Sequence, residues 1–281
     1  MNKVIITCDS TCDLTPEQYA EFGVRPLPLY IRLGEDEYRD GVDIDTAGLF
    51  TRIKACGQMP KTSALSMDDY IKVWKPIIDA GDEVVHINIS SEFSACHQNA
   101  HLAAQELGHV YPVDSLNLSS GSGHLAIDAS FMAKEGKSAK EIADALNQKR
   151  EKLNVSFVLE TMEYLAKGGR CPSIAAFAAG LLRLRLCIEV HDGKMGVGKK
   201  YRGKMDTVLC DYVRECLTAA GEVELDRIYI THSGVSDEII EKVRQAILAV
   251  QPFKRILVST AGCTVASHCG PGTLGILFYN K

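Results

Sequence analysis

Residues 84–108 read VVHINISSEFSACHQNAHLAAQELG, and this stretch contains the structural unit from which we predict the fold. The apolar run at 84–89 is typical of a buried strand. Serines at positions 90, 91 and 94 crowd the turn that follows, and a helix is predicted from Ser94 to Leu107, ending at Gly108. Such hydroxyls either cap a helix or bind a ligand, and this stretch alone leaves both interpretations open.

The first half of the chain repeats this alternation of strand and helix. Strands are predicted over 4–7, 27–33, 84–89 and 109–113, and helices begin near Thr15, Asp45, Ser66, Ser94 and Ser138. A further helix is predicted after the segment 114–125 and runs to about Lys134. Pro26 and Pro28 favour an edge position for the strand at 27–33. Strands separated by helices of this length indicate a mostly parallel sheet with helices on both faces.

The second half is less regular. Strands are predicted over 155–159, 186–190, 194–197, 227–231, 256–259 and 274–279, and helices over 161–167, 174–184, 205–220 and 237–250. The Asp192-Gly193 pair predicts a hairpin turn, which makes this sheet mixed. We therefore predict an α/β fold with an N-terminal domain over 1–152 and a C-terminal domain over 153–281.

Composition restricts the class of protein. The chain has 281 residues, 46% of them hydrophobic, and a formal charge of −5, which is typical of a soluble globular protein and gives no electrostatic reason to expect nucleic acid or an anionic membrane as a partner. No apolar stretch is long enough to span a bilayer. The ten cysteines include no CxxC pair, which argues against a metal site and favours reduced thiols in the cytoplasm.

Hydroxyl- and glycine-rich turns follow several predicted strands or precede helices, at 9–11, 61–63, 90–94 and 114–121. Ligands of parallel α/β sheets bind at this end of the strands, where helix N-termini favour an anion. Neither a phosphate-binding GxxxxGK[ST] loop nor a complete GxGxxG occurs. A serine hydrolase that pairs Ser94 with His232 or His268 remains a weak alternative, because no GxSxG elbow is present.

Taken in order, several short motifs resemble the DegV family, whose characterised members bind fatty acids. The matching stretches are Asp9-Ser10-Thr11-x-Asp13-Leu14, Lys61-Thr62-Ser63, Ser90-Ser91-x-x-Ser94, Val113-Asp114-Ser115, Ser120-Gly121-x-Gly123, Glu160-Thr161-Met162-Glu163-Tyr164-Leu165, Gly168-Gly169-Arg170, His232-Ser233-Gly234 and His268-x-Gly270-Pro271-Gly272-Thr273-Leu274-Gly275. The likeness runs from about residue 4 to about residue 279, and the ordered set is specific although each motif alone is weak.

The resemblance implies a three-layer α/β/α domain followed by a two-layer α/β domain, with the acyl chain in an apolar tunnel between them. Its carboxylate is expected at Thr62, Ser94, the backbone at Ala95, and His268. Further residues expected to line the site are Ser63, Ser120, Gly121, Cys269 and Gly270. The resemblance also implies that Arg170 serves a partner, a separate fatty acid kinase whose ATP-binding subunit forms an acyl phosphate for phospholipid synthesis.

The sequence departs from the family's usual pattern beside Ser94. The family usually has Gly-Thr there and Pro-Ser after its Thr-Ser, whereas this chain has Ala95-Cys96 and Leu65-Ser66. We expect a less polar head-group site, because a thiol is a weak donor.

On this basis we expect a ligand carrier with no complete active site of its own, no cofactor, no metal and no stable membrane insertion. An enzyme acting on a small phosphorylated or carboxylated metabolite and a stand-alone lipid-sensing module remain the alternatives.

Overall fold

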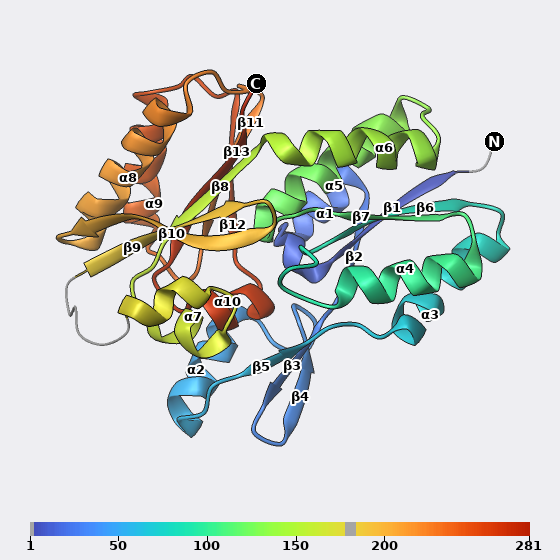
Figure 1. Cartoon of the computed structure of the whole chain (residues 1–281), viewed down its shortest axis with the longest axis horizontal. Coiled ribbons are helices and arrows are strands. Elements are labelled where there is room, and N and C mark those ends of the chain that lie inside the picture. Colours follow the sequence, from blue (N-terminus) through green and yellow to red (C-terminus); the bar gives the residue numbers. More distant parts are fainter. Residues whose placement is uncertain (1–2, 178–183) are drawn as a thin grey trace.

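The computed structural model describes residues 3–177 and 184–281, and its N-terminal half is built on a parallel four-stranded sheet of order β2-β1-β6-β7. Its strands are β1 (Val4–Asp9), β2 (Val24–Leu27), β6 (Glu83–Asn88) and β7 (Val110–Asp114). Figure 1 shows helices on both faces: α3 (Met67–Asp79) and α4 (Cys96–Leu107) on one, and α1 (Pro16–Phe22), α5 (Ser119–Lys134) and α6 (Ala139–Lys149) on the other. The predicted three-layer arrangement is confirmed.

The C-terminal half contains a mixed six-stranded sheet of order β10-β9-β8-β13-β11-β12. Its strands are β8 (Leu153–Val158), β9 (Leu184–His191), β10 (Lys194–Arg202), β11 (Arg227–His232), β12 (Arg255–Thr260) and β13 (Leu274–Tyr279). Helices α8 (Met205–Ala220) and α9 (Asp237–Leu248) cover its outer face (Figure 1). The predicted hairpin forms, since β9 and β10 are antiparallel on either side of Asp192-Gly193.

A third, small sheet of order β4-β3-β5 lies below the other two in Figure 1. It consists of β3 (Tyr30–Leu33), β4 (Asp36–Arg39) and β5 (Lys61–Ser63), with α2 (Thr46–Cys56) between β4 and β5 in sequence. Ile31, Leu33 and Leu49 of this region share a buried cluster with Cys263 and Ala266 of α10 (Cys263–Cys269), a helix from the far end of the chain. The small sheet and α10 therefore form one packed unit.

Two predicted elements differ from the structure. The stretch 27–33 is not one strand: β2 ends at Leu27 and β3 begins at Tyr30 in another sheet, because Pro28 lies between them and has no N–H to donate to a ladder. The helix predicted at 174–184 is wrong where the structure describes it, since 172–177 is a 3-10 turn and Leu184 begins β9. Positions 178–183 of that prediction lie outside the described residues.

Helix α5 joins the two halves. It contacts the four-stranded sheet on one side and β8, β11 and β13 on the other, and all its residues from Ser119 to Ser130 are buried. The six-stranded sheet begins at Leu153, beside the boundary drawn between 1–152 and 153–281, but α5 and α10 both pack against the opposite half. The division into those two domains stays a prediction.

Candidate functional site

One cavity lies where the two large sheets and the small sheet meet. It encloses about 600 Å³ of space, a volume that includes its open mouth. Most of its wall is apolar, formed by Leu29, Ala64, Ile89, Phe93, Leu118, Phe157, Leu165, Met195, Val265 and Cys269. Its polar lining is Thr62, Ser63, Ser94, Arg170, Thr264 and His268. This composition suits a molecule with a small polar head and an apolar body.

Thr62 and His268 are hydrogen-bonded to each other at this cavity. Thr62 Oγ1 lies 2.9 Å from His268 Nε2, and both residues line the wall. Thr62 comes from β5, a strand of the small sheet, and His268 comes from α10, which packs against that sheet. His268 Nδ1 is buried and finds no hydrogen-bond partner within residues 3–177 and 184–281.

The imidazole of His268 is neutral at physiological pH. Burial, reinforced by the positive charge of Arg170, lowers the pKa of His268 to about 4. Arg170 is exposed at the cavity, where its guanidinium donates to the backbone oxygens of Phe93 (3.3 Å) and Gly168 (2.8 Å). Arg170 therefore supplies positive charge beside hydroxyls and a neutral histidine, an environment that favours an anion.

The turn that carries Ser94 begins directly after β6. Ser94 Oγ accepts a hydrogen bond from the backbone N–H of Cys96 (3.3 Å) and donates to Cys96 Sγ (3.1 Å). The hydroxyl thus bonds to the first residue of α4 and is also part of the cavity wall. Burial raises the pKa of the Cys96 thiol to about 12, so the sulfur keeps its proton and stays a weak partner.

A second cavity of about 380 Å³ lies against the first. The two share Leu118, Phe157, Val265 and Cys269 in their walls, so these side chains lie between them. The second cavity extends between α5 and the six-stranded sheet, and its lining includes Val155, Ala261 and Leu277. The apolar wall of the first cavity thus continues into the second.

The structure brings together six of the residues that the sequence singled out. Those lining the first cavity are Thr62, Ser63, Ser94, Arg170, His268 and Cys269. Arg170, assigned from the sequence to a partner, thus lies at the cavity itself.

Four others are not part of that lining: Ala95, Ser120, Gly121 and Gly270. Ala95 is the exposed N-cap residue of α4, Ser120 bonds to Thr231 Oγ1 at 2.5 Å, and Gly121 allows α5 to approach Val155 closely. Gly270 packs against the ring of Tyr164.

Sequence reasoning missed Thr264 and most of the apolar wall. Thr264 precedes His268 by one helical turn, so both lie on the same face of α10. The four-residue spacing of Thr264 and His268 indicates a shared helix face only if a helix is expected over 263–269, and none is predicted there from the sequence. No group of three or more His, Cys, Asp and Glu side chains is placed to hold a metal ion in the part of the chain that the structure describes.

Three comparisons place the chain among known proteins. The family model described as an uncharacterised protein of the DegV family matches residues 3–281. A solved structure of a DegV family protein from Thermus thermophilus, described for its fatty acid binding, is 31% identical with a TM-score of 0.91, covering 99% of this chain and 100% of that one.

Two curated relatives match over nearly their whole length. A DegV domain-containing protein of Caldanaerobacter subterraneus is 27% identical over 100% of both chains. A protein of Thermotoga maritima named fatty acid-binding protein is 27% identical over 97% of this chain and 96% of its own. With a family model covering residues 3–281 and the same fold in a solved relative, this chain belongs to the DegV family.

Proposed function

We propose that this protein binds a long-chain fatty acid, with the carboxylate at Thr62, Ser94 and His268 and the tail in the two adjoining cavities. The observation that carries this proposal is the Thr62–His268 hydrogen bond at the polar part of an otherwise apolar cavity. The names of the relatives from Thermus thermophilus and Thermotoga maritima support the ligand class. Ala95 stays a candidate only through its backbone N–H, because its side chain is exposed and lies outside the lining.

The neutral state of His268 determines how Thr62 is used. With the proton on Nε2, His268 donates to Thr62 Oγ1, and the Thr62 hydroxyl proton is free to point at a carboxylate oxygen. With the proton on Nδ1, that N–H group is buried without a partner among the described residues. The Thr62 hydroxyl then donates its hydrogen bond to Nε2 and is not available to a carboxylate. We infer that the Nε2–H form is the one that binds the acid.

The tail supplies most of the affinity in this proposal. At about 0.8 kcal/mol per buried methylene, a chain of roughly 14 methylenes gains on the order of 11 kcal/mol before the costs of binding. A charge-assisted hydrogen bond at the head group adds roughly 1.5–3 kcal/mol. The polar residues therefore orient the acid and select it over uncharged lipids.

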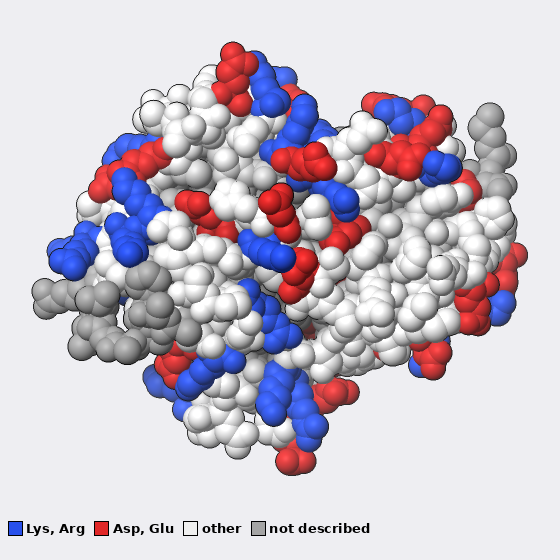
Figure 2. Space-filling model, viewed as in Figure 1, with Lys and Arg blue, Asp and Glu red and all other residues white. Residues whose placement is uncertain are grey.

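Presentation of the acid to a separate kinase is the second part of the proposal. The partner would transfer the γ-phosphoryl group of ATP to a carboxylate oxygen, giving an acyl phosphate and ADP, for use in phospholipid synthesis. Arg170 is suited to this step because it is exposed and lies at the cavity. Figure 2 shows Lys and Arg side chains gathered between the centre of this face and the small sheet below, a surface on which an acidic partner could dock.

We propose that the chain alone has no catalytic activity. The serine-hydrolase alternative finds no support in the hydrogen bonds, because Ser94 pairs with Cys96. The ring of His232 accepts from the backbone N–H of Val235, and His268 pairs with Thr62.

No helix in the described ranges combines the length and the hydropathy needed to cross a membrane.

Organic extraction of the purified protein followed by mass spectrometry tests the ligand. We expect a long-chain fatty acid in the extract, and a higher melting temperature when the delipidated protein receives that acid. An empty extract with no thermal shift would contradict the proposal, and a small polar metabolite would favour an enzyme instead. ATPase or esterase turnover that disappears in Ser94→Ala would overturn the assignment as a carrier.

The kinase step is tested with Arg170→Gln. We expect this variant to keep the acid while phosphorylation by a cognate kinase slows by about tenfold or more. Lys167→Gln, which removes an exposed charge that pairs with Glu163 one helical turn earlier, serves as the control. Loss of the acid from Arg170→Gln, with normal phosphorylation of the protein that remains loaded, would assign Arg170 to binding alone.

A further inference from the structure

The motif Asp9-Ser10-Thr11-Cys12-Asp13 does not line the first cavity, yet the side chains of Asp9, Ser10 and Asp13 bond to segments on both sides of it. The motif consists of the last residue of β1, a 3-10 turn at Ser10–Cys12 and Asp13. Asp9, Thr11 and Cys12 are fully buried, and Asp13 is 4% exposed. Polar side chains this deeply buried are usually hydrogen-bonded to other segments, and their hydrogen-bond partners show which segments they position.

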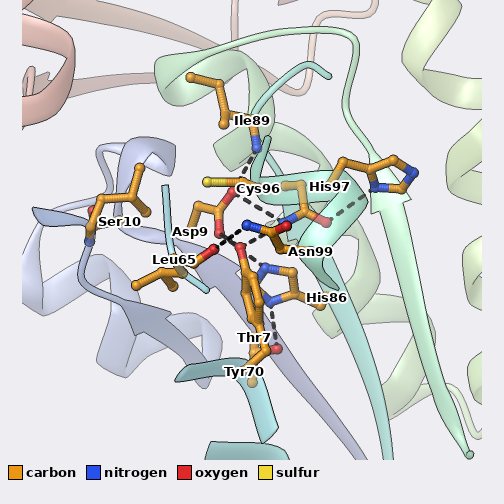
Figure 3. Close-up of polar contacts among 12 residues, drawn as sticks. Thr7, Asp9, Ser10, Leu65, Tyr70, His86, Ile89, Cys96, His97 and Asn99 are labelled. Atoms are coloured by element: carbon orange, nitrogen blue, oxygen red, sulfur yellow. Dashed lines mark hydrogen bonds and ion pairs between the residues drawn. The ribbon is translucent and has the colours of Figure 1, made fainter. Parts of the chain in front are cut away.

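Asp9 anchors the segment that leads into Ser94. Its carboxylate accepts from the backbone N–H of Ile89 (2.9 Å), the hydroxyl of Tyr70 (2.8 Å), His86 Nε2 (3.1 Å) and Asn88 Nδ2 (3.2 Å). Figure 3 shows Ile89, Tyr70 and His86 around Asp9. Ile89 itself lines the cavity and directly precedes the turn of Ser90–Ser94.

The same network continues into α4. Asn88 Oδ1 pairs with His97 Nδ1 at 3.2 Å, one residue after the first residue of that helix. Asn99 Nδ2 donates to the backbone oxygen of Leu65 at 2.7 Å, which ties α4 to the chain that leaves β5 (Figure 3). The position of Ser94 thus depends on groups that are fixed through Asp9.

Ser10 acts on the other side, through Asp40. Ser10 Oγ donates to Asp40 Oδ2 (3.0 Å) and accepts from the backbone N–H of Leu29 (3.1 Å), a residue of the cavity wall. Asp40 accepts from the backbone N–H groups of Cys263 (2.8 Å) and Thr264 (3.1 Å), at the first turn of α10. The helix that carries His268 therefore begins against a buried carboxylate more than 200 residues away in sequence.

Asp13 completes this attachment. Its φ of 51° is in the left-handed region, which an aspartate tolerates better than most residues. Asp13 Oδ1 accepts from the backbone N–H of Gly262 (2.9 Å), and Oδ2 accepts from Ser119 Oγ (2.6 Å) at the start of α5. Gly262 has no side chain to cap α10, so carboxylates from the N-terminal half take that role.

We propose that the segment Asp9–Asp13 is a positioning element of the head-group site: Asp9 fixes the turn that carries Ser94, while Asp13 and the Ser10–Asp40 pair fix the helix that carries His268. The segment touches no ligand and acts by holding the two sets of donors at the spacing that one small anion requires. The identity of that anion as a carboxylate rests on the function proposed above.

The test measures head-group preference, the ratio of the dissociation constants for the methyl ester and the free form of one fatty acid. Asp9→Asn and Asp40→Asn keep the shape of the side chain but turn an N–H donor towards backbone N–H groups. We expect the ratio to fall by about threefold or more in both, while ester affinity stays within about twofold of the unsubstituted protein.

Asp128→Asn is the matched control. Asp128 is 5% exposed and pairs with Arg227 and with Lys149 (2.9 Å), and it lines neither cavity. We expect this variant to lose stability but to keep the ratio. Ser10→Ala, a milder change, replaces Asp40→Asn if the latter fails to fold, with an expected fall of about twofold.

A ratio that is unchanged in the variants of the segment, or that falls equally in Asp128→Asn, overturns the positioning role and leaves the proposed function intact. An unsubstituted protein that shows no preference for the acid overturns the proposed head-group site, and the positioning role falls with it.

Discussion

Thr62 Oγ1 lies 2.9 Å from His268 Nε2, although 206 positions separate the two residues in the chain. Thr62 is in the three-residue strand β5, and His268 is near the end of the seven-residue helix α10. Neither element is long enough to be stable in isolation. The pair exists because Ile31, Leu33 and Leu49 of the small-sheet region pack against Cys263 and Ala266 of α10.

We predict that Thr62→Val weakens binding of the free fatty acid by about 1–3 kcal/mol, since the substitution removes one donor and keeps the shape. Affinity for the methyl ester should change less, because the ester carries no charge. Thr51→Val is the matched control: Thr51 is exposed on α2, away from the cavity lining, and its hydroxyl donates to the backbone oxygen of Ala47. Equal effects at both positions, measured by calorimetry, would refute a role for Thr62 in binding.

We predict that His268 makes the empty protein less stable as the pH falls. The pKa of His268 is about 4 in the folded chain, against about 6.5 when unfolded, so between these values the unfolded chain binds more protons. Stability that is present above pH 6.5 is therefore lost as the pH falls towards 4. Between pH 7 and pH 5 the loss should be about 2 kcal/mol in urea unfolding.

His268→Gln should reduce this loss. The comparison must be made between the two proteins, because burial also lowers the pKa of His124 to about 3, which adds a loss of the same sign in both. Identical pH dependence in His268→Gln and the unsubstituted protein would show that His268 is not buried neutral.

We predict that Gly168→Ala disturbs the head-group site from outside it. A Cβ at Gly168 would overlap His268 Nδ1, so the imidazole must move. Alanine is otherwise favoured over glycine in a helix, which makes a loss diagnostic of this contact. We expect acid affinity to fall by about 1–2 kcal/mol. Gly196→Ala is the control, because a Cβ there meets nothing within 4 Å, and comparable losses in both would exclude the clash.

We predict that Cys96→Thr strengthens the hold on the head group. The thiol of Cys96 is a weak partner for Ser94 Oγ at 3.1 Å, and a threonine hydroxyl that donates to Ser94 Oγ would leave the Ser94 proton for the carboxylate. The gain in acid affinity should be up to about 1 kcal/mol. Cys96→Ala also frees the Ser94 proton but supplies no hydroxyl to orient Ser94 Oγ, so it should give a smaller gain. An equal effect of both substitutions in a titration would point to packing instead.

Local signals predicted most of the long elements correctly. Thr15, Ser66 and Ser138 each begin a helix with a capping box, and β6 and β13 coincide closely with apolar runs. These succeed because a cap and an apolar run act within a few residues of the structure that they specify.

The errors have a physical cause as well. Helix α10 was not predicted, because no capping side chain precedes it in the sequence. The carboxylates of Asp40 and Asp13, from the other end of the chain, accept from its first N–H groups and from Gly262. The predicted helix over 174–184 relied on small apolar residues, yet Leu184 joins β9 in a sheet that only forms with β8 and β10 beside it. Pairing across the fold decided these segments, and local propensity did not.

The sequence by itself determined the alternation of strands and helices, the parallel and mixed sheets, and the family motifs that contain Thr62, Ser94, Arg170 and His268. Tertiary structure alone decided that these four line one cavity, and that Ala95, Ser120, Gly121 and Gly270 do not line it. Periodicity and capping are properties of neighbouring residues and can be read along the chain. The cavity wall is assembled from β5, β8, β10 and α10, from α7 (Glu163–Gly168) and from the turn that carries Ser94. Its composition follows from packing between segments that no local pattern relates.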